Sequence, residues 1–165
     1  MPSYFTFYLT SINGQIPPKI RSYPTVVSSS PKKAIVIVDD ETSYIDLLAQ
    51  LIGDNLNRPV FTFSRPTEAL QALPDIDVGA IVTDFYMPDL NGFEFIQRAS
   101  AILPGVPFIL ITGHGLDLTD EEFAQFPALK SVIHKPFLWR RLAMEIIKYW
   151  PESHPPVERA DLPLT

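Results

Sequence analysis

The sequence predicts an α/β fold in which a doubly wound, five-stranded parallel sheet carries helices on both faces. Short unbroken apolar runs recur along the chain, as in AIVIV at 34–38 and FILIT at 108–112. Segments with helical spacing of apolar residues separate these runs. Strands that are apolar on both faces and alternate with helices are typical of a parallel sheet covered on both sides. Right-handed crossovers between five such strand–helix units give the doubly wound arrangement.

The expected helices begin and end at recognisable residues. Pro66 stands at a helix start, and the spacing of Thr119 and Glu122 is that of a capping box. Pro127 ends the fourth helix early, so we expect that helix to be short and mobile. We expect strands at 34–38, 60–63, 80–83, 108–112 and 131–133, and helices at 43–56, 66–73, 91–101, 119–125 and 138–150.

Composition excludes several classes of protein. The chain has 165 residues, of which 46% are hydrophobic, enough for one domain with a real core. It has no cysteine, which excludes disulfides, cysteine-bound zinc and a thiol nucleophile. The net charge of −6 argues against binding of nucleic acid through its phosphates. No apolar run approaches the ~20 residues of a membrane span, so we expect no membrane partner and a cytoplasmic protein.

The proline-rich ends mark the expected domain boundaries. Nine of the 17 prolines lie in residues 1–31 and 151–165, where no helical or strand periodicity is visible. We expect a flexible N-terminal extension at 1–31, a domain at 32–150 and a proline-rich tail at 151–165. The aromatic residues of the extension leave open whether it adds a strand, docks on a partner or exchanges with a second copy.

Polar residues follow four of the five expected strands. Asp39 and Asp40 follow the first strand, Asp84 the third, Thr112 the fourth and Lys135 the fifth. The carboxyl ends of parallel strands meet at one edge of the sheet, where ligands bind in folds of this class. We therefore expect three carboxylates, a hydroxyl and an ammonium to converge there.

The chemistry that suits this set is phosphoryl transfer. Two carboxylates about 4 Å apart repel by roughly 4 kcal/mol at an effective dielectric constant near 20, and a hard cation relieves that repulsion. Mg²⁺ (or Mn²⁺) is usually held by one or two carboxylates together with phosphate oxygens. Lysine and threonine side chains can contact the remaining phosphoryl oxygens. An aspartate is the expected nucleophile, because a carboxylate can form an acyl phosphate.

The motifs resemble the receiver domain of two-component response regulators. The residues that carry the resemblance are IVIVDDE at 35–41, DFYMPDLNGFEF at 84–95, FILITGHG at 108–115 and HKPF at 134–137. The resemblance covers about 32–150. It implies a flavodoxin-like sheet with strand order 2-1-3-4-5 and a signalling role, with catalysis limited to the protein's own phosphorylation and dephosphorylation.

The resemblance also implies a role for each acidic residue. Asp84 is then the phosphoacceptor. Asp40 and Asp84 ligate Mg²⁺ directly, Asp39 acts largely through water, and the backbone carbonyl of Tyr86 is a further ligand. Lys135 contacts the phosphoryl group.

Other positions are expected to modulate this chemistry. Thr112 would hydrogen-bond the phosphoryl oxygen and shift toward it, Gly113 would leave room for that shift, and a cis bond to Pro136 would help to place the lysine. Met87 belongs to the Met-Pro pair of the acceptor motif. Val132 stands where receivers commonly have an aromatic switch residue, so we expect an atypical output face.

Two bulky residues flank the expected path of the water that hydrolyses the acyl phosphate. Tyr86 lies two residues after Asp84, and His114 lies two residues after Thr112. We hypothesise that they prolong the phosphorylated state. An exposed loop histidine without such a role is an equally open reading of His114.

The expected function is a stand-alone receiver that acts by protein–protein contact. Only fifteen residues follow Trp150, which favours this reading over a chain with its own output domain, although excision from a larger hybrid kinase is an alternative. The phosphoryl donor would be a sensor histidine kinase or a histidine phosphotransfer protein, and a homodimer is a candidate assembly. A phosphate-independent binding module remains the alternative. A phosphohydrolase is disfavoured, because Tyr86 stands where such enzymes often carry a second aspartate.

Overall fold

The computed structural model describes residues 32–113, 116 and 119–151. The expected extension at 1–31, His114 and the tail from residue 152 lie outside the described residues.

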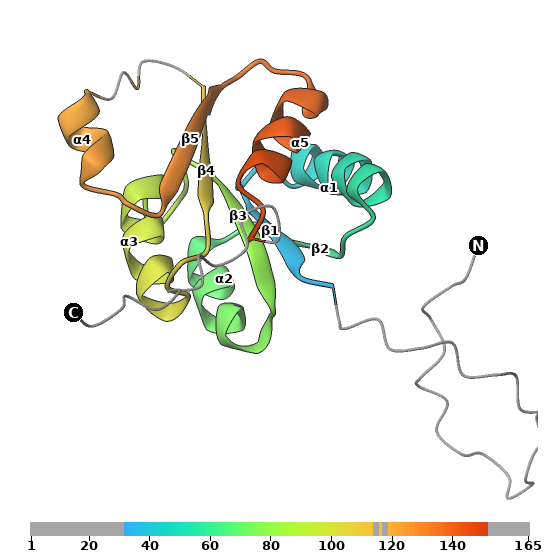
Figure 1. Cartoon of the computed structure of the whole chain (residues 1–165), viewed down its shortest axis with the longest axis horizontal. Helices are drawn as coiled ribbons and strands as arrows, with labels where there is room; N and C mark the ends of the chain where they lie inside the picture. Colours follow the sequence, from blue (N-terminus) through green and yellow to red (C-terminus); the bar gives the residue numbers. More distant parts are fainter. Residues whose placement is uncertain (1–31, 114–115, 117–118, 152–165) are drawn as a thin grey trace, which may run out of the picture.

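The sheet has the predicted class and strand order. All five strands are parallel, and their order is β2-β1-β3-β4-β5. The winding direction changes between β1 and β3, which lie side by side at the centre of the sheet (Figure 1). The strands are β1 (Ala34–Val38), β2 (Val60–Phe63), β3 (Val78–Asp84), β4 (Phe108–Thr112) and β5 (Leu129–His134).

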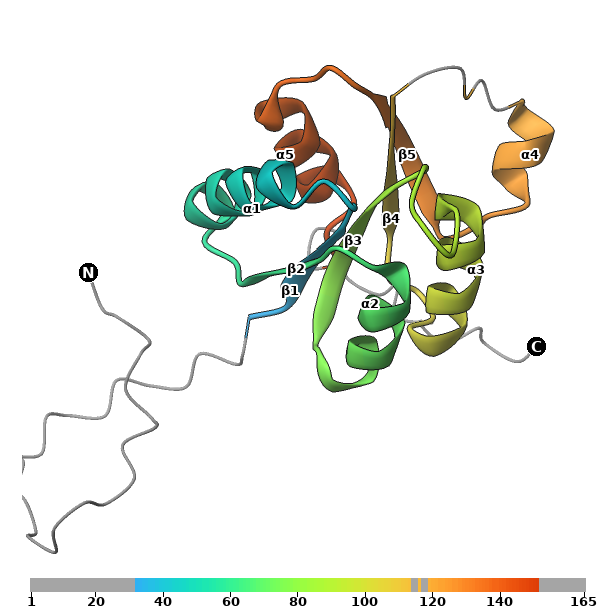
Figure 2. The ribbon, with the colours of Figure 1, turned by 180° about the vertical axis from the view of Figure 1, so that it is seen from behind.

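Helices cover both faces of the sheet. In Figure 1 and in the reverse view of Figure 2, α1 and α5 lie together on one face, and α2 and α3 lie on the other. The helices are α1 (Thr42–Leu56), α2 (Pro66–Ala72), α3 (Gly92–Ile102), α4 (Asp120–Ala124) and α5 (Trp139–Lys148), with a short 3₁₀ turn, η1 (Leu73–Asp75). No helix in this described part of the chain is long and apolar enough to cross a bilayer.

Alternate residues of β1 divide the core into two layers. Ile35 and Ile37 pack toward α1 and α5, whereas Val36 and Val38 pack toward α2 and α3. All four side chains are fully buried. This two-sided burial is the physical reason for the unbroken apolar run in the sequence, since neither face of the strand meets water.

The fifth strand is longer than the sequence predicts. It pairs with β4 from Phe108 opposite Leu129 to Thr112 opposite His134, so the expected range 131–133 is wrong at both ends. Cross-strand hydrogen bonding extends the strand into the polar residues Lys130 and His134, which the apolar pattern could not signal. The fourth helix is short, as expected, although its five residues, Asp120–Ala124, are fewer than the expected 119–125. Thr119 and Glu122 form the predicted capping box.

Helix α3 begins in a capping box that continues the loop after β3. The side chain of Asn91 accepts hydrogen bonds from the backbone N–H groups of Phe93 and Glu94, and the Glu94 carboxylate accepts from the backbone N–H of Asn91. These bonds satisfy N–H groups that the helix itself cannot pair.

Removal of this cap should cost about 1 kcal/mol. We expect Asn91→Ala to lower the free energy of unfolding by about 0.5–2 kcal/mol, because the amide oxygen that accepts two N–H groups is lost. Urea titration followed by circular dichroism measures the change. Asn55→Ala is the matched control, since that amide donates to the Leu51 carbonyl inside α1 and caps no helix start. Equal effects of the two substitutions would contradict a capping role.

The C-terminal end of the domain packs against the edge of the sheet where β3 begins. Trp150 is 5% exposed, and its ring lies where a Cβ atom on Gly79, near the start of β3, would collide with it. The guanidinium of Arg58 lies 4.5 Å from the centroid of the Trp150 ring. The end of α5 is therefore anchored to β3 by one large side chain.

Candidate functional site

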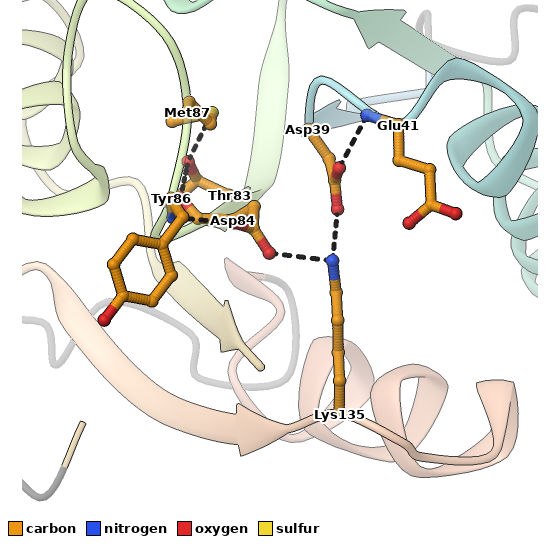
Figure 3. Close-up of polar contacts among 7 residues, drawn as sticks. All are labelled: Asp39, Glu41, Thr83, Asp84, Tyr86, Met87 and Lys135. Carbon is orange, nitrogen blue, oxygen red and sulfur yellow. Dashed lines mark hydrogen bonds and ion pairs between the residues drawn. The ribbon is translucent and has the colours of Figure 1, made fainter. Parts of the chain in front are cut away.

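Three polar residues from three strand ends meet at the carboxyl edge of the sheet. The ammonium of Lys135 lies 2.8 Å from Oδ2 of Asp39 and 2.8 Å from Oδ1 of Asp84. Figure 3 shows the lysine side chain pointing between the two carboxylates. Because both oxygens touch one nitrogen, they cannot be farther apart than twice that distance. The Asp39 and Asp84 side chains are 3% and 7% exposed, and that of Lys135 is 25% exposed.

The loop after β3 holds the Asp84 carboxylate from its other side. Oδ2 of Asp84 accepts a hydrogen bond of 2.7 Å from the backbone N–H of Tyr86. The hydroxyl of Thr83 donates to the backbone carbonyl of Asp84 at 3.1 Å and lies 3.8 Å from the sulfur of Met87. Both oxygens of the Asp84 carboxylate therefore have partners, and the carboxylate has a fixed orientation (Figure 3).

Gly92 lets the acceptor loop pack tightly against α3. Its N–H donates to the Phe85 carbonyl at 2.8 Å. A Cβ at this position would lie 2.8 Å from the Asp84 carbonyl oxygen and 3.0 Å from the Cα of Phe85. Only glycine fits without moving the backbone that carries Asp84.

The acidic residues after β1 lie in different environments. Oδ1 of Asp39 accepts a hydrogen bond of 2.9 Å from the backbone N–H of Glu41, which fixes the buried carboxylate (Figure 3). Asp40 is exposed. The chain thus presents one buried and one solvent-facing carboxylate in succession.

Burial and ion pairing shift the pKa values of the central residues. Burial raises the pKa of Asp84 above its ordinary value, and hydrogen bonds from Lys135 and from the Tyr86 N–H only partly oppose this. Burial lowers the pKa of Lys135, but hydrogen bonds to Asp39 and Asp84 outweigh it, so the pKa lies above the ordinary value. The lysine therefore stays charged beside the two carboxylates.

Thr112 places a buried hydroxyl at the same edge. Its side chain is fully buried, and its Oγ1 has no hydrogen-bond partner among the residues that the structure describes. Its backbone carbonyl accepts a hydrogen bond of 2.7 Å from the N–H of Lys135, which ties β4 to the segment that carries the lysine. A buried hydroxyl without a partner is uncommon, and it is well suited to an incoming oxygen acceptor.

The remaining predicted positions are distributed around this centre. The bond from Lys135 to Pro136 is cis, as expected. A Cβ on Gly113 would meet open space, which is consistent with the room expected beside Thr112. Val132 is partly buried against the core on the α2 and α3 face. His114 lies outside the described residues.

The sequence did not point to Tyr44. Its ring centroid lies 5.0 Å from the Lys135 ammonium. The available signal was its place one turn after the acidic triplet, on a helix that begins at the same edge of the sheet.

The donor set fits a hard divalent cation. Among the described residues, no three acidic or histidine side chains converge to form a ready-made metal cage. Mg²⁺ does not need one, because it commonly binds through one or two carboxylates with waters and phosphate oxygens completing its shell. Asp39 and Asp84 bring two carboxylates together that could serve as oxygen ligands, and the exposed Asp40 follows Asp39 in the chain.

Comparison with known proteins identifies the same domain in other chains. A family profile described as response regulator receiver domain matches residues 35–147. The transcriptional regulatory protein FixJ of Rhizobium meliloti is 34% identical over 102 residues, which cover 61% of this chain and 48% of FixJ. The chain thus spans about half the length of FixJ. It spans 24% of a longer relative, the C4-dicarboxylate transport transcriptional regulatory protein DctD of Rhizobium meliloti.

Solved structures agree with this result. A CheY-like receiver domain protein from Methanospirillum hungatei superposes with a TM-score of 0.63 at 26% identity, covering 71% of this chain and 92% of its own. The beryllofluoride-activated NtrC4 receiver domain dimer gives a TM-score of 0.64 at 28% identity, covering 73% and 98%. With the matched profile spanning most of the domain and the same fold at this identity, the chain belongs to the response regulator receiver domain family of two-component systems.

Proposed function

We propose that the protein accepts a phosphoryl group on Asp84 from a phosphohistidine of a sensor histidine kinase or a histidine phosphotransfer protein. The proposal is supported by the two buried carboxylates of Asp39 and Asp84 that Lys135 bridges, together with the Thr112 hydroxyl, which has no partner within the described part of the chain. These groups offer a carboxylate nucleophile, a fixed cation and a spare hydrogen-bond donor within one small region.

The transfer forms one bond and breaks one. An oxygen of the Asp84 carboxylate attacks phosphorus, and a P–O bond forms. The P–N bond of the phosphohistidine breaks, its electron pair stays on the imidazole nitrogen, and that nitrogen takes up a proton from solvent. Lys135 and Thr112 would hydrogen-bond the phosphoryl oxygens, which lowers the barrier by positioning and charge stabilisation.

The reaction also needs compensation for negative charge. Asp39, Asp40, Asp84 and the Tyr86 carbonyl would hold Mg²⁺ (or Mn²⁺), which when bound neutralises charge on the phosphoryl oxygens. Lys135 alone balances only one of the two buried carboxylates in the described structure.

Asp84→Asn should abolish phosphorylation. After incubation with Mg²⁺ and acetyl phosphate or phosphoramidate, we expect intact-mass spectrometry to show one added phosphoryl group on the wild type and none on this variant, because an amide is not a nucleophile here. Asp89→Asn is the matched control, since Asp89 is an exposed carboxylate at the same edge that pairs with Arg65. It should keep the adduct.

Two outcomes would contradict the proposal. An adduct on Asp84→Asn would place the phosphoryl group elsewhere. No adduct on the wild type, with small donors and with a phosphohistidine protein, would favour the phosphate-independent binding module.

We further propose that the phosphorylated domain signals by protein–protein contact. The short α4 and the presence of Val132 give an output surface of α4, β5 and α5 without the usual aromatic switch residue. A second copy of the chain is a candidate partner, since the similar NtrC4 receiver domain forms a dimer. Sedimentation of the protein with and without the phosphodonor tests this.

A further inference from the structure

One side of the Lys135 ammonium faces an aromatic ring. Tyr44 lies in the first turn of α1, and the centroid of its half-buried ring is 5.0 Å from the lysine nitrogen. The carboxylates of Asp39 and Asp84 hold the same nitrogen by two contacts of 2.8 Å. The ammonium therefore has two anionic partners and one aromatic partner.

The ring of Tyr44 is itself held by the segment that carries the lysine. Phe137 meets it edge to face, with ring centroids 6.3 Å apart and an interplanar angle of 84°. Lys135 and Phe137 thus contact one ring from the same short loop. This contact connects the start of α1 to the segment after β5, the two places from which Asp39 and Lys135 reach the site.

The aromatic contact matters because lysine is flexible and Lys135 is partly exposed. Its ammonium lies at the end of a flexible four-carbon stem and is strongly hydrated when it is exposed to water. Once Asp84 carries a phosphoryl group, the oxygen that now pairs with the lysine is altered, and the ammonium has to move to a phosphoryl oxygen. The face of an aromatic ring attracts a cation but carries no net charge, so it does not compete with the phosphoryl oxygens for the ammonium as a third anion would.

We propose that Tyr44 is a positioning residue that keeps the Lys135 ammonium at the acceptor edge while its anionic partners change. This inference rests on the proposed phosphorylation of Asp84. The aromatic ring positions the ammonium and the hydroxyl does not. We therefore expect phenylalanine at this position to retain the role and an aliphatic residue to lose it.

Two variants test the inference on the full chain. Tyr44→Phe keeps the ring, and Tyr44→Leu removes it but keeps an apolar side chain in the half-buried position. Tyr44→Met serves if the leucine variant unfolds. Tyr149→Leu is the matched control, because it removes another tyrosine that has a lysine over its ring. Tyr149 directly follows α5, and the Lys148 ammonium lies 4.7 Å from its ring centroid.

The first measurement is the NMR chemical shift of the Lys135 side-chain methylene protons. The ring current of Tyr44 should move them upfield in the wild type and in Tyr44→Phe, and Tyr44→Leu should return them to ordinary values. The second is the rate of adduct formation with acetyl phosphate. We expect it to fall about 3- to 10-fold in Tyr44→Leu and to change by less than about twofold in Tyr44→Phe and Tyr149→Leu.

Each result decides the matter. Upfield shifts lost together with a slowed rate only in Tyr44→Leu support the inference. Absence of upfield shifts in the wild type overturns the contact, and equal rates in all variants overturn the positioning role. No adduct on the wild type with acetyl phosphate and with a phosphohistidine protein, with the shifts present, overturns the proposed function and with it this role, and the wild-type control makes that failure distinguishable.

Discussion

Replacement of Lys135 by methionine is expected to lower the free energy of unfolding by about 2–4 kcal/mol at pH 7. Loss of one partner from a buried ion pair typically costs about 3–5 kcal/mol, because an uncompensated charge remains buried. We take a smaller value here, because the lysine side chain is 25% exposed and water can approach the site. Methionine preserves most of the length of the side chain, so lost packing contributes little.

The size of this effect should depend on pH. Burial already raises the pKa of Asp84, and loss of the lysine raises it further. A carboxyl whose pKa is higher in the folded state destabilises the fold as pH rises above its unfolded value of about 3.9. The difference in stability between variant and wild type should therefore be small near pH 3.5 and grow toward pH 7.

Urea titrations at several pH values measure this difference. Lys33→Met is the matched control, because Lys33 forms an ion pair of 2.6 Å with Asp77 in which both side chains are exposed. Exposed pairs contribute about 0–1 kcal/mol, because water and salt screen them. Added Mg²⁺ should stabilise Lys135→Met more than the wild type, since in the variant the metal ion can replace the lost ammonium beside the two carboxylates. Equal losses in Lys33→Met and Lys135→Met at pH 7 would contradict the buried-pair account.

Trp150→Ala is expected to lower the free energy of unfolding by about 3–5 kcal/mol. Truncation of a large buried aromatic residue removes its apolar burial and leaves a cavity. Here it also removes the contact with Arg58 and detaches the end of α5 from β3. Trp139→Ala should cost less, because Trp139 is only partly buried.

A double-mutant cycle with Gly79 makes this prediction specific. Gly79→Ala alone should destabilise by about 1–3 kcal/mol, because its new methyl group collides with the Trp150 ring. In the Trp150→Ala background the same methyl group meets the cavity and should cost little. Chemical denaturation of the four proteins gives the coupling energy. Additive effects would show that the Trp150 ring does not occupy the space above Gly79.

Much of the candidate site was predictable from where the apolar runs end. Parallel strands bring their carboxyl ends to one edge, so Asp39, Asp84 and Lys135 could be expected together without knowledge of the rest of the fold. Their contacts at 2.8 Å agree with that expectation. The roles of these residues in phosphoryl transfer stay predictions.

Contacts between helices and loops were not predictable in the same way. Tyr44 meets Lys135, and Phe93 on α3 stacks on Phe126 at 4.6 Å, although no periodic pattern relates these positions. Such pairs depend on how far each helix slides along the sheet, which side-chain packing decides. The extent of β5 depended on backbone pairing with β4, which polar residues also provide.

The position of Trp150 also determines what tryptophan fluorescence reports about this protein. The chain has two tryptophans, and Trp150 is a buried indole whose N–H meets no hydrogen-bond partner within residues 32–113, 116 and 119–151. A buried indole that is shielded from water emits at shorter wavelength than an exposed one. Because Trp150 lies against the first residues of β3, at the edge away from Asp84, its emission reports detachment of the last helix rather than events at the acceptor. Trp150 is thus an intrinsic fluorescent probe of folding that lies at the other end of β3 from Asp84.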